Sequence, residues 1–289
     1  MTDVSQPMTI QQCLLRAREL PGSDSARLDV ELLLASVLER DRSYLYTWPE
    51  KILTEPQLSA FEALLLARQK GQPVAHLLGE REFWGLPLAV NDSTLIPRPD
   101  TETLVESVLD LGLPDNARVL DLGTGTGAIA LALASEYPEW AVVAVDFSSA
   151  AVSLAERNRQ TLALDNVEIF ASDWFSQLTD RRFHLIVSNP PYIDEDDPHL
   201  SQGDVRFEPL SALVAKNQGL ADLQHIIEAG RDHLLPGGWL FLEHGYTQGG
   251  AVRGLMEQAG YEGVETLRDF GDNDRVTRGR SPNTGSAEW

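Results

Sequence analysis

The chain has 289 residues, 43% of them hydrophobic and 23% charged, a composition that excludes a mostly disordered protein. It carries 23 basic and 44 acidic residues and a formal net charge of −21, so nucleic acid and anionic membrane surfaces are unfavourable partners. Cys13 is the only cysteine, which excludes internal disulfides and thiolate metal clusters. No apolar run is long enough to span a bilayer and the N-terminus has no signal-peptide pattern, so we expect a cytoplasmic protein without membrane contact.

Residues 1–80 predict a small helical domain. Apolar residues between positions 10 and 17 share one helical face, and Pro21 with Gly22 ends that pattern. The next segment is apolar on most of its circumference, which is typical of the buried centre of a helical bundle. A third helix is predicted to begin at Thr54, with Gln57 completing a capping box. This domain offers no catalytic cluster, so we expect it to serve packing or partner docking.

Residues 81–91 predict a β-hairpin around Gly85, within a linker spanning 81–95. From Arg118 onward, short apolar runs alternate with amphipathic helical segments. This alternation predicts a doubly wound, mostly parallel α/β sheet with helices on both faces, in a catalytic domain covering 96–280. The last two apolar runs have no helix between them, so we expect an antiparallel last strand. Residues 281–289 are small and polar and predict a flexible tail.

Ligands of such sheets bind at the carboxyl ends of the strands. In "DLGTGTGAIA", Gly123, Gly125 and Gly127 permit a tight turn and close approach of the backbone to a ligand at a helix N-terminus. Asp146 closes the next strand, where an acid suits ribose hydroxyls. These features fit a dinucleotide as well as S-adenosylmethionine, and Asp146 alone could simply cap the helix that follows it.

Two acidic residues distinguish between a dinucleotide and S-adenosylmethionine as the ligand. Asp121 precedes the glycines and Asp173 follows the third strand; a carboxylate beside a pyrophosphate is unfavourable, whereas an ammonium and a sulfonium group attract it. S-adenosylmethionine is therefore favoured over NAD. Asp173 would accept from the adenine amine and Trp174 would pack against the ring, although Trp174 alone could equally be a core aromatic.

The fourth strand ends in "SNPPYI". Methylating an amide or an aromatic amine is difficult because the nitrogen lone pair is delocalised, so a catalyst must accept hydrogen bonds from both N–H groups and draw the nitrogen toward tetrahedral geometry. The side-chain oxygen of Asn189 and the carbonyl of Pro190 can form this pair of acceptors, and Tyr192 can cover the flat group. No general base and no metal is required; the acidic run at 194–197 is interpreted as a solvated loop.

The segment "LIPRPDTE" holds Arg98 between two prolines. Arg98 could face the site or pair with an acid, and spacing alone does not decide between these. Asp100 or Thr101 could cap the helix that follows.

The motifs "LIPRPDTE", "DLGTGTGAIALALA", "SDWF", "SNPPYI", "RFEPLSAL" and "FLEHG", in this order and spacing, resemble the HemK/PrmC family of peptide chain release factor N(5)-glutamine methyltransferases. The likeness runs from about residue 8 to residue 280. It implies a Rossmann-like class I S-adenosylmethionine-dependent domain behind a helical domain that helps to dock class 1 release factors. The implied reaction methylates the side-chain amide of the glutamine in their Gly-Gly-Gln motif.

The family's pattern also implies roles for individual residues. By this pattern, cofactor contacts would come from the glycine turn and the neighbouring strand ends: Gly123, Thr124, Gly125, Thr126, Gly127, Asp146, Trp174 and Asn189. The charge argument above adds Asp121 and Asp173 to the expected cofactor contacts. The glutamine would be held by the four residues Asn189, Pro190, Pro191 and Tyr192, with Asn189, Pro190 and Tyr192 as the catalytic ones.

The main alternative is an adenine-specific DNA methyltransferase, because "NPPY" can serve an exocyclic amine by the same two acceptors. Such an enzyme normally needs a basic groove and a target-reading domain, whereas this chain is acidic. A non-catalytic binding module and an NAD-dependent dehydrogenase are weaker alternatives, and cofactor titration would distinguish them.

Overall fold

The structure is a computed structural model that describes residues 7–283, so most of the tail predicted at 281–289 lies outside the described residues. The chain forms two compact units, Met1–Glu80 with Pro198–Phe207, and Arg81–Asp197 with Glu208–Trp289. Within residues 7–283, no helix is both long and apolar enough to cross a membrane.

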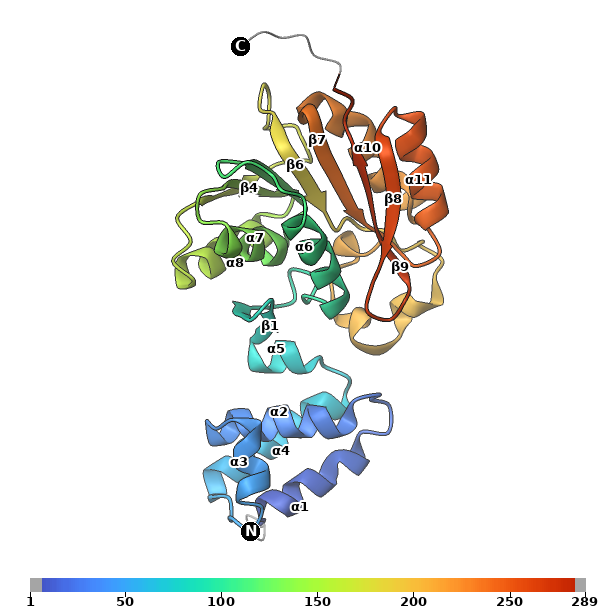
Figure 1. Cartoon of the computed structure of the whole chain (residues 1–289). Helices are drawn as coiled ribbons and strands as arrows, with labels where there is room; N and C mark the ends of the chain where they lie inside the picture. The colour runs from blue at the N-terminus through green and yellow to red at the C-terminus, as the bar shows by residue number, and fades with distance from the viewer. Residues whose placement is uncertain (1–6, 284–289) are drawn as a thin grey trace. The chain divides into compact units, whose positions relative to one another are not determined.

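The first unit is a helical bundle around α2 (Figure 1). Its helices are α1 (Ile10–Leu14), followed by a 3-10 turn (Leu15–Glu19), α2 (Ala26–Leu38), α3 (Arg42–Thr47), α4 (Glu55–Gln69) and α5 (Val74–Leu78). Helix α2 contacts α1, α3, α4 and α5, and its Val30, Leu33 and Leu34 are completely buried, which confirms the predicted central helix. Helix α4 begins where expected, and the Thr54 amide donates to Gln57 Oε1 at 3.0 Å.

A segment distant in sequence belongs to this bundle. Two short 3-10 turns, Pro198–Ser201 and Gly203–Phe207, lie in the first unit, although sequence pattern had placed them within 96–280. Arg68 connects them to the helices, since its Nε donates to Asp29 at 2.8 Å and its Nη1 to Asp204 at 2.8 Å. Arg68 is largely buried, so two acidic partners offset the cost of removing its charge from water.

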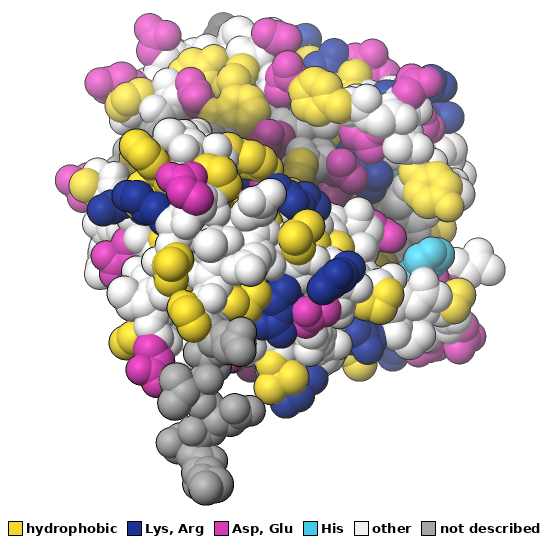
Figure 2. Space-filling model, turned by 90° about the horizontal axis from the view of Figure 1, so that it is seen from below, with side chains coloured by type: hydrophobic (Ala, Val, Ile, Leu, Met, Phe, Trp, Pro, Cys, Tyr) yellow, Lys and Arg dark blue, Asp and Glu magenta, His cyan; other side chains and the backbone are white. Residues whose placement is uncertain are grey.

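Charge is distributed unevenly between the two units. The first unit contains nine basic and twelve acidic residues, whereas the second contains 14 basic and 32 acidic residues. Figure 2 shows dark-blue Lys and Arg side chains mixed with hydrophobic ones on the face in view. Large exposed apolar side chains of the first unit include Leu15, Tyr46, Trp48, Ile52 and Leu66. The acidity of the chain therefore lies mainly in the second unit.

Strands β1 (Glu80–Phe83) and β2 (Leu86–Ala89) form the predicted hairpin. The two residues at its turn, Trp84 and Gly85, have φ values of 54° and 71°. Two consecutive left-handed residues are typical of the type I′ turn, whose twist matches that of the paired strands.

The second unit contains a seven-stranded sheet in the order β5-β4-β3-β6-β7-β9-β8. Its strands are β3 (Arg118–Leu122), β4 (Ala141–Asp146), β5 (Val167–Ala171), β6 (Phe183–Ser188), β7 (Leu234–Glu243), β8 (Glu262–Arg268) and β9 (Asp274–Arg280). Strands β3 to β7 pair in parallel, and β9 runs antiparallel to both β7 and β8. The predicted class I fold and its antiparallel last strand are confirmed.

Helices cover both faces of this sheet (Figure 1). Successive residues of β3 enter different cores: Val119 packs with α6 (Glu102–Leu109) and α7 (Ala128–Glu136), and Leu120 with α10 (Ala221–His233) and α11 (Gly249–Gln258). The remaining helical segments are α8 (Ser149–Thr161), α9 (Lys216–Gly219) and the 3-10 turns Pro99–Thr101 and Leu210–Ala212. Because β3 lies between β4 and β6, strand order reverses there, and a ligand site is expected at the carboxyl ends of these strands.

Candidate active site

The turn after β3 is built from glycines in left-handed conformations. Gly123, Gly125 and Gly127 have φ values of 68°, 57° and 86°, which other residues adopt only at a cost. The Thr124 amide donates to the carbonyl of Val145 in β4 at 3.0 Å. The turn is therefore attached to the neighbouring strand end, with backbone exposed on its other side.

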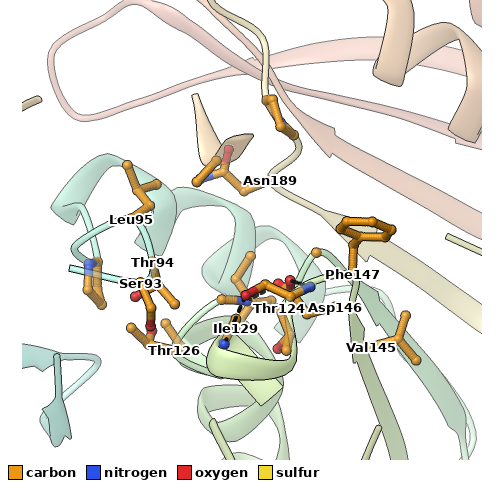
Figure 3. A pocket seen from close by; sticks show the side chains of 18 of the residues that line it. Ser93, Thr94, Leu95, Thr124, Thr126, Ile129, Val145, Asp146, Phe147 and Asn189 are labelled. Atoms are coloured by element: carbon orange, nitrogen blue, oxygen red, sulfur yellow. Dashed lines mark hydrogen bonds between the residues drawn. The ribbon is translucent and has the colours of Figure 1, made fainter. Parts of the chain in front are cut away.

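A cavity lies over this turn (Figure 3). Eight of the residues predicted to contact ligands line it: Gly123, Thr124, Gly125, Thr126, Asp146, Trp174, Asn189 and Pro191. Five others are not among its lining residues: Asp121, Gly127, Asp173, Pro190 and Tyr192. Strand ends far apart in sequence thus meet at one cavity, as the topology requires.

Asp121 lies beneath the turn rather than in the cavity wall. It is completely buried, and its Oδ2 accepts from the Thr124 hydroxyl at 2.6 Å and from the Ala130 amide at 3.2 Å. Its Oδ1 has no hydrogen-bond partner among the described residues. Burial raises the pKa of Asp121 to about 7, although these two donors oppose the rise. Asp121 therefore both braces the turn and holds a poorly compensated carboxyl group beside the cavity.

Asp146 joins the turn to the end of β4. Its Oδ2 accepts from the Gly125 amide at 2.9 Å and its Oδ1 from the Ser148 amide at 2.9 Å. Burial raises its pKa. Each carboxylate oxygen can accept more than one hydrogen bond, so Asp146 can still accept from a ligand in the cavity.

Besides Phe83, the aromatic rings of Trp174 and Phe147 line the cavity. Trp174 follows β5, and a Cβ atom at Gly123 would lie 3.7 Å from its ring. Phe147 follows Asp146 and is 80% exposed although it lines the cavity. Asp173, by contrast, lines a separate hollow that also contains Ser176 and His225. The rings, unlike Asp173, are therefore placed to contact a flat ligand group in this cavity.

Asn189 follows β6 and faces the cavity (Figure 3). Its Nδ2 donates to Thr101 Oγ1 at 3.3 Å, and its Oδ1 makes no hydrogen bond among the described residues. Tyr192 is not among the lining residues, and its hydroxyl donates to Glu243 Oε1 at 3.2 Å. The Asn189 amide therefore presents a free acceptor at the rim, whereas the Tyr192 hydroxyl is bound to a buried acid.

Arg98 both lines the cavity and pairs with an acid. Its Nη2 lies 2.6 Å from Oε2 of Glu208, whose Oε1 accepts from the Ile96 amide at 2.9 Å. The Glu208 side chain is fully buried. The ion pair joins the loop before α6 to the segment before the 3-10 turn Leu210–Ala212.

Several cavity residues were not predicted from the sequence, namely Ser93, Thr94, Leu95, Phe147, Ser148, Ser211 and Ala212. Phe147 could have been noticed because an aromatic side chain follows the strand-end acid directly. Ser211 and Ala212 lie in a short 3-10 turn and the others between regular elements, where no periodic pattern marks them. Thr101 was considered only as a helix cap, but its side chain caps nothing and instead accepts from Asn189.

Comparison with known proteins decides the family. Residues 13–79 match the family model of the PrmC N-terminal domain, and residues 99–204 match that of the methyltransferase small domain. The release factor glutamine methyltransferase of Shewanella oneidensis is 56% identical over 94% of this chain and 98% of its own length. The enzyme of the same name from Escherichia coli is 58% identical over 91% of this chain and 95% of its own length. The chain belongs to the release factor glutamine methyltransferase family. The resemblance seen in the sequence motifs is thereby confirmed, and the protein is a methyltransferase.

Solved structures support the fold independently. A methyltransferase from Pyrococcus furiosus superposes with a TM-score of 0.53 at 18% identity, covering 78% of this chain and 99% of its own. A 16S rRNA methyltransferase from Thermus thermophilus superposes with a TM-score of 0.50 at 23% identity, covering 70% of this chain and 49% of its own. At these identities the likeness concerns the class I methyltransferase fold alone.

Proposed function

We propose that this protein transfers a methyl group from S-adenosylmethionine to the side-chain amide of the glutamine in the Gly-Gly-Gln motif of class 1 release factors. The observation that carries the proposal is the position of Asn189. Its amide lies at the same cavity as the glycine turn and Asp146, with Oδ1 free to accept. The names of the close relatives support the substrate.

The residues around the cavity fit S-adenosylmethionine. Asp146 can accept from the two ribose hydroxyls, and the rings of Trp174 and Phe147 offer flat apolar surfaces to adenine. The unpartnered Oδ1 of buried Asp121 suits a ligand that carries positive charge near the turn, because a nearby cation stabilises the ionised carboxylate. A pyrophosphate in this place would be repelled, so these residues fit a dinucleotide less well.

Bound S-adenosylmethionine supplies an electrophilic methyl group on a positively charged sulfur. The protein contributes mainly orientation: Asn189 Oδ1 and the Pro190 carbonyl accept hydrogen bonds from the two N–H groups of the substrate amide and direct its lone pair toward the methyl carbon for in-line displacement. The methylated nitrogen then loses its proton to water, so no side chain has to act as a strong base.

The charge distribution favours a protein substrate. The unit that holds the cavity has 14 basic against 32 acidic residues, which opposes binding of a DNA duplex because phosphate contacts need basic side chains. The helical unit, which has nine basic and twelve acidic residues and exposes Tyr46, Trp48 and Ile52, is the proposed docking surface for the release factor. Such a partner would be met in the cytoplasm, the expected location of this enzyme.

Label transfer tests the substrate class. The protein is incubated with methyl-labelled S-adenosylmethionine and either unmethylated class 1 release factor or adenine-containing duplex DNA. We expect label in the release factor alone. Label in the DNA alone would favour the adenine methyltransferase alternative.

A further inference from the structure

A second buried acid, Glu243, lies behind Asn189. Strands β6 and β7 are in register with Ser188 opposite Leu242, so Asn189, which follows β6, lies next to Glu243, the last residue of β7. Glu243 is 1% exposed. Its Oε1 accepts from the Tyr192 hydroxyl at 3.2 Å, and its Oε2 has no hydrogen-bond partner among residues 7–283. An acid buried with an unused oxygen is costly, and packing alone gives no reason to keep it there.

Thr101 connects this acid to the rim of the cavity. It is 4% exposed, and its Oγ1 accepts from Asn189 Nδ2 at 3.3 Å. The Thr101 hydroxyl also acts on Glu243, where it favours the ionised carboxylate. A hydroxyl has one proton to donate; because the Thr101 oxygen accepts from Asn189, that proton is available to Glu243.

Thr101 and Asn189 alone do not fix the direction of their hydrogen bond. A hydroxyl can donate or accept, and an amide turned over would offer its oxygen to Thr101 instead of its nitrogen. The turned amide would present N–H groups to the substrate, which also carries N–H groups. An ionised carboxylate removes this ambiguity, since it only accepts and so requires the Thr101 hydroxyl to donate to it.

We propose that Thr101 and Glu243 are positioning residues that hold the Asn189 amide with its oxygen toward the substrate nitrogen. This inference rests on the proposed function. In this arrangement Glu243 accepts a hydrogen bond from the Thr101 hydroxyl, the Thr101 oxygen accepts one from Asn189 Nδ2, and Oδ1 is left as the acceptor at the cavity. The same carboxylate holds the hydroxyl of Tyr192, so one acid orients two residues of the "NPPY" segment.

Burial, rather than the surrounding charges, raises the pKa of Glu243 toward neutral pH. Burial raises the pKa of Glu243 to about 7, with Asp100 acting in the same direction and Thr101, Arg275 and Tyr192 opposing it. The adjacent His244 points elsewhere, with Nε2 2.7 Å from Thr277 Oγ1. Protonated Glu243 can donate to Thr101 and permit the reversed amide, so turnover should fall as the pH falls through about 7.

The kcat values of matched variants test the role of the hydrogen bond between Thr101 and Asn189. Thr101→Val removes the hydroxyl and should lower kcat about tenfold, the effect of one hydrogen bond of ordinary strength, with cofactor affinity unchanged. Thr101→Ser should keep kcat near the wild-type value. Thr103→Val is the control, because the Thr103 hydroxyl is also buried but has no partner. A Thr101→Val enzyme with wild-type kcat would overturn the proposal.

Two further measurements separate positioning from simple stability. At saturating substrates, kcat of the wild type should rise with pH around 7, and Glu243→Gln should remove that rise. A pH profile of kcat that is the same in Glu243→Gln as in the wild type would contradict the proposal.

In the free protein, the Asn189 side-chain amide signals in a ¹⁵N NMR spectrum should titrate near pH 7, but not in Glu243→Gln. If the Asn189 amide signals changed neither with pH nor in Thr101→Val, the proposal would also be overturned. An inactive wild type would instead overturn the proposed function, and the NMR titration would still decide the orientation of Asn189.

Discussion

The backbone amide of Gly125 donates to Oδ2 of Asp146 at 2.9 Å, so the glycine turn and the acid at the end of β4 form one structural element. This bond holds the carboxylate at the cavity, where its remaining lone pairs can meet ribose hydroxyls. The turn therefore positions the residue expected to select the ligand.

Replacing Asp146 should abolish most cofactor affinity. We expect Asp146→Ala to weaken S-adenosylmethionine binding by about 10²-fold or more, since two hydrogen bonds to a charged group are lost. Calorimetry measures the change. Asp165→Ala, which removes a fully exposed carboxylate of the same unit, should bind like the wild type. Equal affinities for both variants would exclude Asp146 from the cofactor site.

Asn189→Ala separates binding from catalysis. Cofactor affinity should remain within a few-fold of wild type, whereas kcat should fall about 10²-fold or more because a positioned acceptor is lost from the transition state. Single-turnover rates at saturating cofactor measure this effect. Wild-type turnover in the variant would remove Asn189 from the mechanism.

Cofactor affinity should depend on pH through Asp121. Its pKa is about 7 in the ligand-free protein, and a cationic ligand favours the ionised form and lowers that pKa. Binding therefore releases protons near neutral pH and should tighten as the pH rises from about 6 to 8. S-adenosylhomocysteine, which lacks the sulfonium charge, should show a smaller effect, measurable by calorimetry in buffers of different ionisation enthalpy. An identical pH dependence in Asp121→Asn would assign the effect to another group.

Acid should destabilise the first unit through Glu31. Although burial of Glu31 acts to raise its pKa, hydrogen bonds from Tyr46, Arg27 and Arg42 lower it to about 2. A lowered carboxyl pKa stabilises the fold above the ordinary value of 4.5 and loses this effect as the pH falls toward 2. Glu31→Gln should therefore melt earlier than wild type at pH 7, with the difference shrinking at low pH.

The matched control for Glu31 is Glu50→Gln, which alters an exposed acid of the same unit. It should melt like the wild type throughout. A melting difference between Glu31→Gln and wild type that stays constant with pH would show that the acid is not held by its charge.

Features set by local pattern were predictable from the sequence. The alternating apolar runs indicated the sheet, Gly85 the hairpin, and the strand-end signals brought Gly123, Asp146 and Asn189 to one cavity. These predictions were possible because hydrophobic periodicity and turn-forming residues act over only a few positions of the sequence. The family resemblance added the substrate, which no local pattern encodes.

Contacts between distant residues were not predictable in this way. Thr101 and Asn189 are 88 residues apart, and Arg68 and Asp204 are 136 residues apart. Neither pair has a periodic signature. The short helix α3 was also missed, because six residues are too few to show a helical period. Asp173, expected at the adenine amine from its place after β5, is not among the residues that line this cavity, and its role stays a prediction.

The central claim is that Asn189 presents a glutamine amide for methylation, and locating the methyl group by tandem mass spectrometry tests it most directly. Unmethylated class 1 release factor is incubated with S-adenosylmethionine and either wild-type protein or Asn189→Ala. We predict one added methyl group on the glutamine side chain of the Gly-Gly-Gln motif with the wild type, and almost none with the variant. A methyl group on any other residue, or equal methylation by both proteins, would contradict the account.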